Sequence, residues 1–237
     1  MIRVFTLGTG ASVSDVHRST TMLAIDNDQD LIAVDCGADI HQRMLLVGLE
    51  ARPIAGLLLT HVHADHLAGF PLLVQKLWLS GVQERLEVWG ASETLAAARR
   101  LLEVFSPDLW ADRISLTFHP LNPDPDSLFE IGSSWSVQGR WVDHLEPTLG
   151  FRFVDSSSGK VVAYSGDTAP CDAVVSLGRQ ADLLVHEATG DFEGHSSAAA
   201  AAEIARRSGA RRLTLVHAPG DGPERNRDLE AARKVLP

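Results

Sequence analysis

Cysteine and long apolar stretches are both scarce in this sequence of 237 residues. It contains only two cysteines, Cys36 and Cys171, which form no Cys-x-x-Cys pair. We therefore expect neither a disulfide framework nor a structural zinc site built from cysteines. No apolar run approaches the roughly 20 residues that a helix needs to cross a bilayer. The first eight residues alternate like a strand and lack the basic start and apolar core of a signal peptide, so we expect a cytoplasmic protein without a membrane partner.

Positive charge is scarce too. Lys and Arg total 21 against 31 Asp and Glu, which gives a formal net charge of −10. This balance argues against broad nucleic-acid binding, which rests on a positive surface, although a local basic patch would be compatible with it. Most of the basic residues are arginine, which suits planar phosphate or carboxylate groups. Divalent cations bound in a cleft would offset part of the negative charge.

The remaining composition is that of an ordinary globular protein, with 45% hydrophobic and 22% charged residues. Short apolar segments typical of strands recur along the chain, and helical patterns alternate with the later ones. The predicted strands are residues 3–7, 21–25, 31–34, 54–59, 86–88, 115–118, 135–142, 150–154, 161–164, 183–185 and 213–216. The predicted helices are residues 40–47, with Asp39 as N-cap, 70–79, 92–104 and 196–207.

This mixture of hairpins and strand–helix alternation predicts an α/β protein with two packed sheets and helices outside them. We expect a four-layer αββα sandwich in a single domain over residues 1–237. The Pro- and Asp-rich run at 122–126 reads as a turn. It predicts a boundary between two similar halves, roughly 1–121 and 122–237.

Four candidate metal ligands crowd into six residues directly after the predicted strand 54–59. They are His61, His63, Asp65 and His66. Three imidazoles and a carboxylate suit zinc, manganese or iron, and loops at strand ends commonly carry chemistry. The structural alternative is a surface histidine cluster without a metal, but it gives no reason why four such residues lie within six positions. The pattern predicts a metal site.

Three further candidates follow predicted strands later in the chain: His144, Asp167 and His217. Each alone is more typical of a hydrogen-bonded turn residue. The repeated placement of His and Asp at strand ends allows one domain to direct all of them toward a single cleft.

The segment 60–66 resembles the His-x-His-x-Asp-His signature of the metallo-β-lactamase superfamily, and the later His, Asp and His occur in that family's order. The resemblance implies the αββα fold and a dinuclear metal centre. By the same resemblance, one metal is held by His61, His63 and His144, a second by Asp65, His66 and His217, and Asp167 bridges them. The implied cofactors are two divalent ions, with zinc the first choice and manganese the second.

Within the superfamily the chain looks most like the ribonuclease Z group and its short phosphodiesterase relatives. The resemblance is carried by residues 7–10 (LGTG), 35–37 (DCG), 186–189 (HEAT) and 195–197 (HSS). Two departures are evident. The interval between His144 and Asp167 has no room for the arm with which ribonuclease Z proteins grip tRNA, and residues 218–222 after His217 lack the family's phosphate-contacting Ser and Arg. Both departures disfavour tRNA as a partner.

We therefore predict a metal-dependent hydrolase, a phosphodiesterase that cleaves small or cyclic phosphodiesters or nucleotide ends through a hydroxide shared by the two metals. Asp65 would orient that nucleophile or act as its general base. His195 would protonate the leaving group, held and kept cationic by Glu187. The structural alternatives are an N-cap-like role for His195 before the Ala-rich helix and a ligand-orienting role for Glu187.

Two other activities share this ligand set. One is tRNA 3′-end processing, and the other is thioester or lactone hydrolysis of the glyoxalase II type, whose usual C-terminal helical domain would not fit into the 20 residues after His217. The resemblance also makes a homodimer an assembly to test. The substrate, the metal and the oligomeric state are left open by the sequence.

Overall fold

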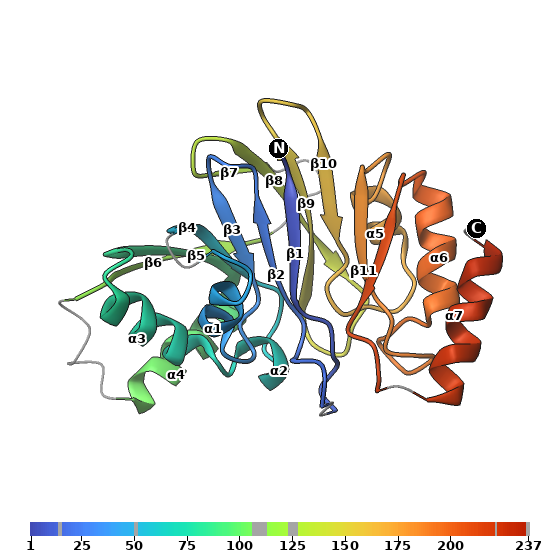
Figure 1. Ribbon diagram of the computed structural model, residues 1–237, viewed down its shortest axis with the longest axis horizontal. Coiled ribbons are helices and arrows are strands. Elements are labelled where there is room, and N and C mark those ends of the chain that lie inside the picture. Colours follow the sequence, from blue (N-terminus) through green and yellow to red (C-terminus); the bar gives the residue numbers. More distant parts are fainter. Residues whose placement is uncertain (14–15, 50–51, 106–112, 123–127, 221, 236–237) are drawn as a thin grey trace. The chain divides into compact units, whose positions relative to one another are not determined.

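Two six-stranded sheets organise the chain in the computed structural model (Figure 1). The structure describes residues 1–13, 16–49, 52–105, 113–122, 128–220 and 222–235. The contacts divide the chain into two compact units. The first comprises residues 1–8, 20–122 and 131–133, and the second comprises residues 9–19, 123–130 and 134–237.

The first sheet follows the order of its strands in the chain. It consists of β1 (Arg3–Gly8), β2 (Met22–Asp26), β3 (Leu31–Val34), β4 (Ile54–Leu59), β5 (Arg85–Ala91) and β6 (Ser115–Leu121). The pairs from β1 to β3 are antiparallel, and those from β3 to β6 are parallel. Because parallel strands leave the sheet at the same edge, the residues after β3 and β4 are brought side by side.

The helices of the first unit are α1 (Ile40–Leu45), α2 (Ala64–Leu67), α3 (Phe70–Ser80) and α4 (Ser92–Val104). The Asp39 carboxylate caps α1 by accepting a hydrogen bond from the Gln42 N–H. Gly81 ends α3 in the left-handed region, with φ at 65°. Apolar side chains of these helices, such as Phe70 and Leu95, pack with strand residues such as Leu57 in one buried core.

The second sheet repeats this pattern of an antiparallel part followed by a parallel part. Its strands are β7 (Phe129–Ile131), β8 (Trp135–Val142), β9 (Thr148–Asp155), β10 (Val161–Tyr164), β11 (Leu183–Glu187) and β12 (Leu213–Val216). The pairs β8–β9 and β9–β10 are antiparallel, whereas β10–β11 and β11–β12 are parallel. The carboxyl ends of β10, β11 and β12 therefore meet at one edge of the sheet.

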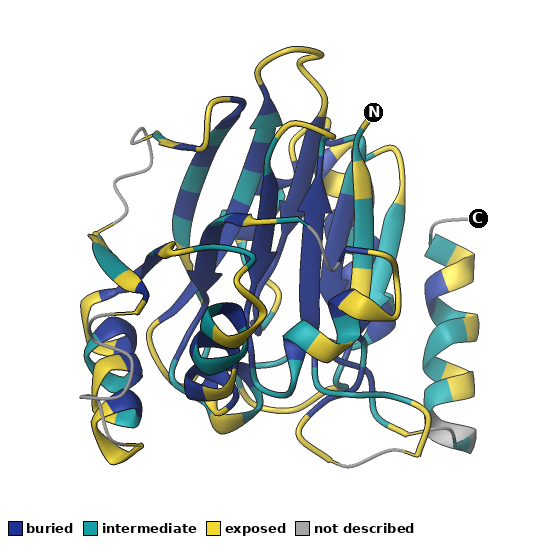
Figure 2. Ribbon diagram, turned by 60° about the vertical axis from the view of Figure 1, so that its left-hand side comes forward, coloured by how far each residue is buried: buried dark blue, intermediate teal, exposed yellow. Residues whose placement is uncertain are grey.

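The helices of the second unit are α5 (Asp172–Leu177), α6 (Ala198–Ser208) and α7 (Pro223–Val235). The Ser197 hydroxyl caps α6 by accepting from the Ala200 N–H, and Gly209 ends the helix at φ 69°. Leu177 and Ile204 pack with Ala163 and Leu184 in the core of this unit. Figure 2 shows burial concentrated in the strands, while the helices present both buried and exposed residues.

Every predicted strand and helix is present, with shifts at their ends. The α/β class is confirmed, whereas the single-domain boundary stays a prediction, and residues 123–127 of the predicted turn lie outside the described residues. The N-cap of α6 is Ser197, so that helix begins two residues later than expected. The sequence prediction missed β7, α2, α5 and α7. No helix within the described ranges combines the length and hydropathy needed to cross a membrane.

Candidate functional site

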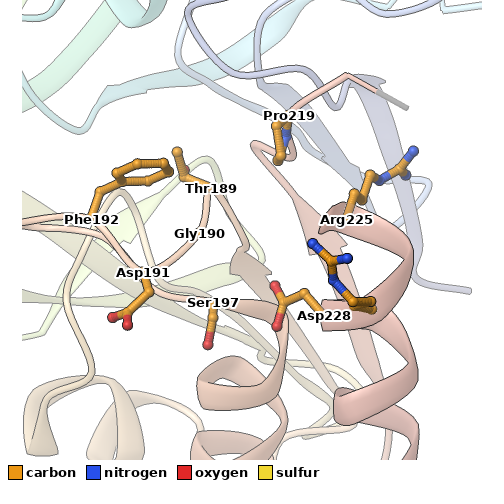
Figure 3. A pocket seen from close by; sticks show the side chains of 9 residues that line it. Thr189, Gly190, Asp191, Phe192, Ser197, Pro219, Arg225 and Asp228 are labelled. Carbon is orange, nitrogen blue, oxygen red and sulfur yellow. The ribbon is translucent and has the colours of Figure 1, made fainter. Parts of the chain in front are cut away.

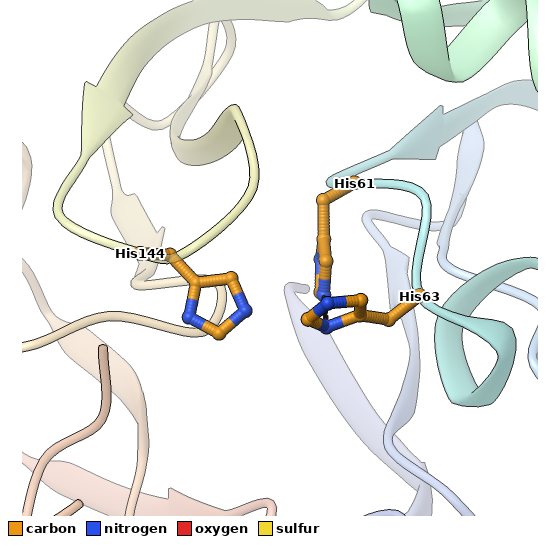
Figure 4. A group of neighbouring side chains, drawn as sticks. All are labelled: His61, His63 and His144. Carbon is orange, nitrogen blue, oxygen red and sulfur yellow. Dashed lines mark hydrogen bonds between the residues drawn. The ribbon is translucent and has the colours of Figure 1, made fainter. Parts of the chain in front are cut away.

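The segment 60–66 leaves the end of β4 and turns into the short helix α2. His61 and His63 lie on the connecting loop (Figure 4). Asp65 and His66 lie on α2 itself, not on a loop as expected, and His63 is the N-cap residue of this helix. His61 and His66 are fully buried, with exposed fractions of 0%. The loop after β4 and the short helix α2 thus carry all four predicted ligands of the first unit.

The donor atoms of these residues lie at contact distances from one another. The His61 Nε2 and His63 Nδ1 atoms are 2.9 Å apart, and the His66 Nε2 and Asp65 Oδ2 atoms are 3.6 Å apart. The imidazole centroids of His61 and His66 are separated by 4.2 Å. The structure therefore brings the four residues into one cluster.

The Nδ1 atoms of His66 and His61 are held by Asp35 and Thr60, respectively. The buried Asp35 carboxylate lies 2.8 Å from His66 Nδ1 and accepts from the Thr60 N–H and hydroxyl. Because the Thr60 hydroxyl gives its proton to Asp35, its oxygen accepts from His61 Nδ1 at 2.9 Å. Both histidines thus carry their proton on Nδ1, and their Nε2 atoms face His63 and Asp65, the other two members of the cluster.

The predicted residues of the second unit lie at the common edge of its parallel strands. Asp167 follows β10, and His217 follows β12. The His217 Nε2 and Asp167 Oδ2 atoms are 3.2 Å apart. Gly166 makes the turn before Asp167 at φ 63°, where a Cβ would lie 2.8 Å from the Leu149 carbonyl oxygen. His217 itself adopts φ 50°, a region that non-glycine residues occupy at an energetic cost and that is common at functional sites.

His144 lies on the loop after β8 (Figure 4). Its Nδ1 is 2.7 Å from the Gly194 carbonyl oxygen. A carbonyl oxygen can only accept, so Nδ1 carries the proton and Nε2 presents a lone pair. One donor atom from each of His144, Asp167 and His195 lies within 4.8 Å of the others. The second unit therefore also gathers its predicted ligands.

Glu187, at the end of β11, is the centre of the hydrogen bonds around this half-site. It is fully buried, and its Oε1 lies 3.0 Å from His195 Nδ1. Its Oε2 accepts from the Thr189 N–H and hydroxyl, both at 2.8 Å. The Thr189 oxygen is in turn 2.7 Å from His217 Nδ1. Since the Thr189 hydroxyl proton goes to the carboxylate, His217 donates from Nδ1, and its Nε2 is the nitrogen that faces Asp167.

Glu187 thus fits both roles that the sequence left open for it. It contacts His195 directly, and it contacts the predicted ligand His217 through Thr189. The N-cap-like role for His195 is wrong, because Ser197 caps α6. The side chain of His195 is 18% exposed, and its Nδ1 is held by the Glu187 carboxylate. This geometry is suited to proton transfer at Nε2.

Sequence reasoning missed the roles of Asp35, Thr60, Thr189 and the Gly194 carbonyl. Asp35 and Thr189 lie inside motifs that were noted only for their resemblance. Their polar side chains directly after strands were the available signal. No sequence pattern indicates the Gly194 carbonyl, because its role depends on the path of the loop from Thr189 to Ser197.

Burial perturbs two titratable groups close to these clusters. His186 is completely buried, and desolvation lowers its pKa below the usual value of 6.5. Its Nδ1 donates to the Glu187 carbonyl, at 2.8 Å, so it serves the packing of β11. Burial, together with the charge of Asp35, raises the pKa of the Cys36 thiol well above its usual value.

The donor sets of both units fit divalent metal ions. Two ligands of one tetrahedral zinc ion, each about 2.0–2.1 Å from the metal, lie roughly 3.3 Å apart. The 2.9, 3.2 and 3.6 Å spacings found within the two clusters bracket this value. Metal-binding histidines usually hold their other ring nitrogen in a hydrogen bond. The Nδ1 atoms of four histidines here already make such bonds: His61, His66, His144 and His217.

Comparison with known proteins agrees with this chemistry. Residues 31–218 match the model of the beta-lactamase superfamily domain, and the chain belongs to this family. It is 32% identical over 244 residues to the ribonuclease Z of Mycobacterium sp. (strain KMS), a match that covers 92% of this chain and 84% of that protein. The fold of this family implies that the chain binds divalent metal and is a hydrolase.

Two solved structures share the fold. The metallo-β-lactamase fold protein YhfI from Bacillus subtilis superposes with a TM-score of 0.80 at 21% identity, covering 99% of this chain and 93% of that one. Human tRNase Z, short form, has a TM-score of 0.80 at 26% identity, with 93% of each chain covered. The predicted αββα class, that of the metallo-β-lactamase fold, is thereby confirmed.

Proposed function

We propose that the two clusters together form a dinuclear metal centre. His61, His63 and His144 would hold one ion, Asp65, His66 and His217 the other, and Asp167 would bridge them. The support is that four of the imidazoles have the nitrogen that is not needed for a metal in a hydrogen bond. Asp35, Thr60, Gly194 and Thr189 each engage one of these nitrogens. When bound, two divalent ions activate water and neutralise the charge of a phosphate group. Zinc is the first candidate and manganese the second.

The proposed reaction is hydrolysis of a phosphodiester. Asp65, whose side chain is 11% exposed, would accept a proton from the attacking water and aim it at phosphorus. His195 would donate a proton from Nε2 to the departing alkoxide. Glu187 would hold His195 Nδ1 and favour the cationic imidazole. The pairing of His195 with the buried Glu187 is the observation that carries this proposal, because a thioester releases a better leaving group and needs no such donor.

The preferred substrates are small or cyclic phosphodiesters or nucleotide ends. The interval between His144 and Asp167 holds only β9, a short turn and β10, so it contains no arm that could grip a tRNA body. The match to the mycobacterial ribonuclease Z extends over 244 positions, more than this chain contains, so that protein has residues with no counterpart here. Both observations favour a substrate smaller than tRNA.

The decisive experiment compares leaving groups. We expect His195→Ala to lower the hydrolysis of a dinucleotide, which releases an alkoxide, by about 10²–10⁴-fold. A p-nitrophenyl phosphodiester releases a stable phenolate and should lose far less. Metal content, measured by mass spectrometry of the reconstituted protein, should remain near two equivalents in both proteins. Equal losses for the two substrates at full metal content would show that His195 is not the proton donor.

Ribonuclease Z activity is the second candidate, favoured by the 32% identity to a curated ribonuclease Z. This function requires binding of precursor tRNA that weakens steeply with salt. Gel-shift titrations of precursor tRNA at low and moderate salt, followed by cleavage assays, test it directly. Absence of a shift at low salt would exclude it, while 3′-end cleavage would replace the small-substrate proposal.

A further inference from the structure

Each unit of the chain contains a cavity within the range of about 300–1,000 Å³ that is usual for small-ligand sites. In the second unit a cavity of about 570 Å³ lies beside Thr189 (Figure 3). Its lining includes two carboxylates, those of Asp191 and Asp228, and two guanidinium groups, those of Arg225 and Arg227. These mixed charges favour no single class of ligand. The cavity of the first unit, in contrast, has a wall of uniform chemistry.

This second cavity is a groove of about 340 Å³ between α2 and α4, which we call the α2–α4 groove. Figure 1 shows both helices at the same end of the first unit. Seven of the eight lining residues are aliphatic. The segment that forms α2 contributes Val62, Ala64, Leu67 and Ala68. The groove therefore suits an apolar group, which gains free energy when its surface is removed from water.

The α4 side of the groove is a second apolar face of that helix. The residues that α4 buries in the core are Thr94, Leu95, Ala98 and Leu102. The groove residues Ala97, Leu101 and Val104 follow a helical spacing of their own. Val104 is 74% exposed, so packing of the core gives no reason for an apolar side chain there. A ligand in the groove supplies one.

Arg100 is the single charged residue in the lining of the α2–α4 groove. It lies one turn from both Ala97 and Val104, on the same face of α4, and it is exposed. Among the residues that the structure describes, none forms a hydrogen bond or an ion pair with its guanidinium group. Arginine pairs well with carboxylate and phosphate groups. The groove thus combines an apolar wall with one positive charge.

The groove shares its wall with the metal-ligand candidates of the first unit. Along one short segment His61, His63 and Asp65 contribute to the donor clusters, whereas Val62 and Ala64 between them line the groove. A molecule whose phosphate lies at the cluster can therefore extend over this segment into the groove.

We propose that the α2–α4 groove binds the non-reacting arm of the substrate, an apolar chain or ring whose anionic end pairs with Arg100. The inference rests on the proposed phosphodiesterase function and names its substrate class: a phosphodiester in which one alcohol is apolar and carries a further anion. The volume suits a single arm of this kind, whereas a stable contact with a second copy of the chain buries about 800 Å² on each partner.

Four p-nitrophenyl phosphodiesters with the same leaving group test the apolar and the charged contact separately. They are the methyl, butyl and hexyl esters, and the hexyl ester with a terminal carboxylate. We expect kcat/KM to rise about two- to fourfold with each methylene that enters the groove. The carboxylate should raise it about two- to fivefold more, because the ion pair with Arg100 is exposed, and this second gain should fall as salt is increased.

Each contact has its own variant and control, and each gain is measured relative to the methyl ester in the same protein. Val104→Ser should reduce the gain from the chain. Arg100→Ala should abolish the gain from the carboxylate, and Arg100→Lys should keep part of it. Leu79→Ser, at an exposed leucine of α3, and Arg233→Ala, at an exposed arginine of α7, should change neither gain. Equal kcat/KM for the four esters, or gains that survive Val104→Ser and Arg100→Ala, would overturn the proposal.

Binding separates the groove from the proposed reaction. Hexanesulfonate has an apolar chain and an anionic end but no bond to hydrolyse, so it can be titrated calorimetrically into the folded protein. Val104→Ser and Arg100→Ala should each weaken its binding at least twofold, whereas methanesulfonate, which lacks the chain, controls for anions that bind elsewhere. If no ester is cleaved but this binding pattern is found, the reaction is wrong and the groove assignment stands.

If the esters are cleaved but hexanesulfonate binds the wild type and both variants equally, the reaction stands and the groove assignment is wrong. Sedimentation of the same proteins tests the other occupant. A dimer that Val104→Ser dissociates, together with equal kcat/KM for the four esters, would assign the groove to a second copy of the chain and overturn the proposal.

Discussion

At the residue scale, the position of a side chain in the fold decides its chemistry. Glu187 is fully buried and accepts hydrogen bonds from His195, Thr189, Thr168 and Ser196. These four partners surround its carboxylate only in the folded protein. The identity of these partners could not be derived from the HEAT motif alone. Asp35 shows the same dependence, because its contacts with Thr60 and His66 join residues 25 and 31 positions apart in the chain.

The two free cysteines should differ sharply in reactivity. Cys36 is fully buried, and its raised pKa keeps the thiol protonated at neutral pH, whereas Cys171 is partly exposed. We expect a disulfide reagent such as dithionitrobenzoate to modify one thiol per chain under native conditions and two in urea. Cys171→Ser should remove the native reaction. Rapid modification of both thiols in the folded protein would contradict the described burial of Cys36.

At the scale of elements, strands proved easier to predict than short helices. Periodicity located the strands because most of them are short apolar runs, of which β3 and β10 are buried along their whole length. The four-residue helix α2 carries no such signal, since its position depends on contacts with the loop after β3. The Cys36 N–H donates to the His66 carbonyl, and the Gly69 N–H donates to the Cys36 carbonyl, both at 2.8 Å. Tertiary contacts of this kind are invisible to a local pattern.

Gly37 is the position where this contact between loop and helix is tightest. A Cβ there would lie 1.7 Å from the Asp65 carbonyl oxygen, so Gly37→Ala must displace α2 and with it Asp65 and His66. We expect the variant to lose roughly one of the two metal equivalents proposed above and about 1–3 kcal/mol of unfolding free energy. Metal analysis and urea denaturation measure these effects.

Gly222→Ala is the matched control for this change, because nothing lies within 4 Å of a Cβ at that position. It should keep both the metal content and the stability of the wild type. Full metal content in Gly37→Ala would mean that α2 tolerates the shift and that its fixed position is not needed for the site.

At the scale of the whole molecule, the sequence indicated which His and Asp side chains follow strands but not how they are oriented. The residue types and their places after strands were readable, because a strand end is a local feature. The orientation of each imidazole depends on a partner elsewhere in the chain, as His144 depends on the Gly194 carbonyl. The cavity beside Thr189 was missed for the same reason, since it requires α7, which the sequence pattern did not indicate.

The pH dependence of stability should contain a contribution from His186. Its folded-state pKa is lowered by burial, so the unfolded chain takes up a proton near pH 6.5 while the folded chain does not. His186 should therefore leave the unfolding free energy unchanged above pH 6.5, where its imidazole is neutral in both states. Below pH 6.5 the unfolding free energy should fall as the pH drops toward the folded pKa, by at most about 1.4 kcal/mol per pH unit. His186→Asn keeps a donor for the Glu187 carbonyl but cannot titrate in this range, so the variant should lose this slope.

Urea denaturation of the chelator-treated protein between pH 5 and 8 measures the difference between wild type and variant, and chelation keeps metal release from adding its own pH dependence. Parallel curves for wild type and His186→Asn would show that His186 takes up its proton equally in both states. In that case burial of this imidazole would contribute nothing to acid unfolding.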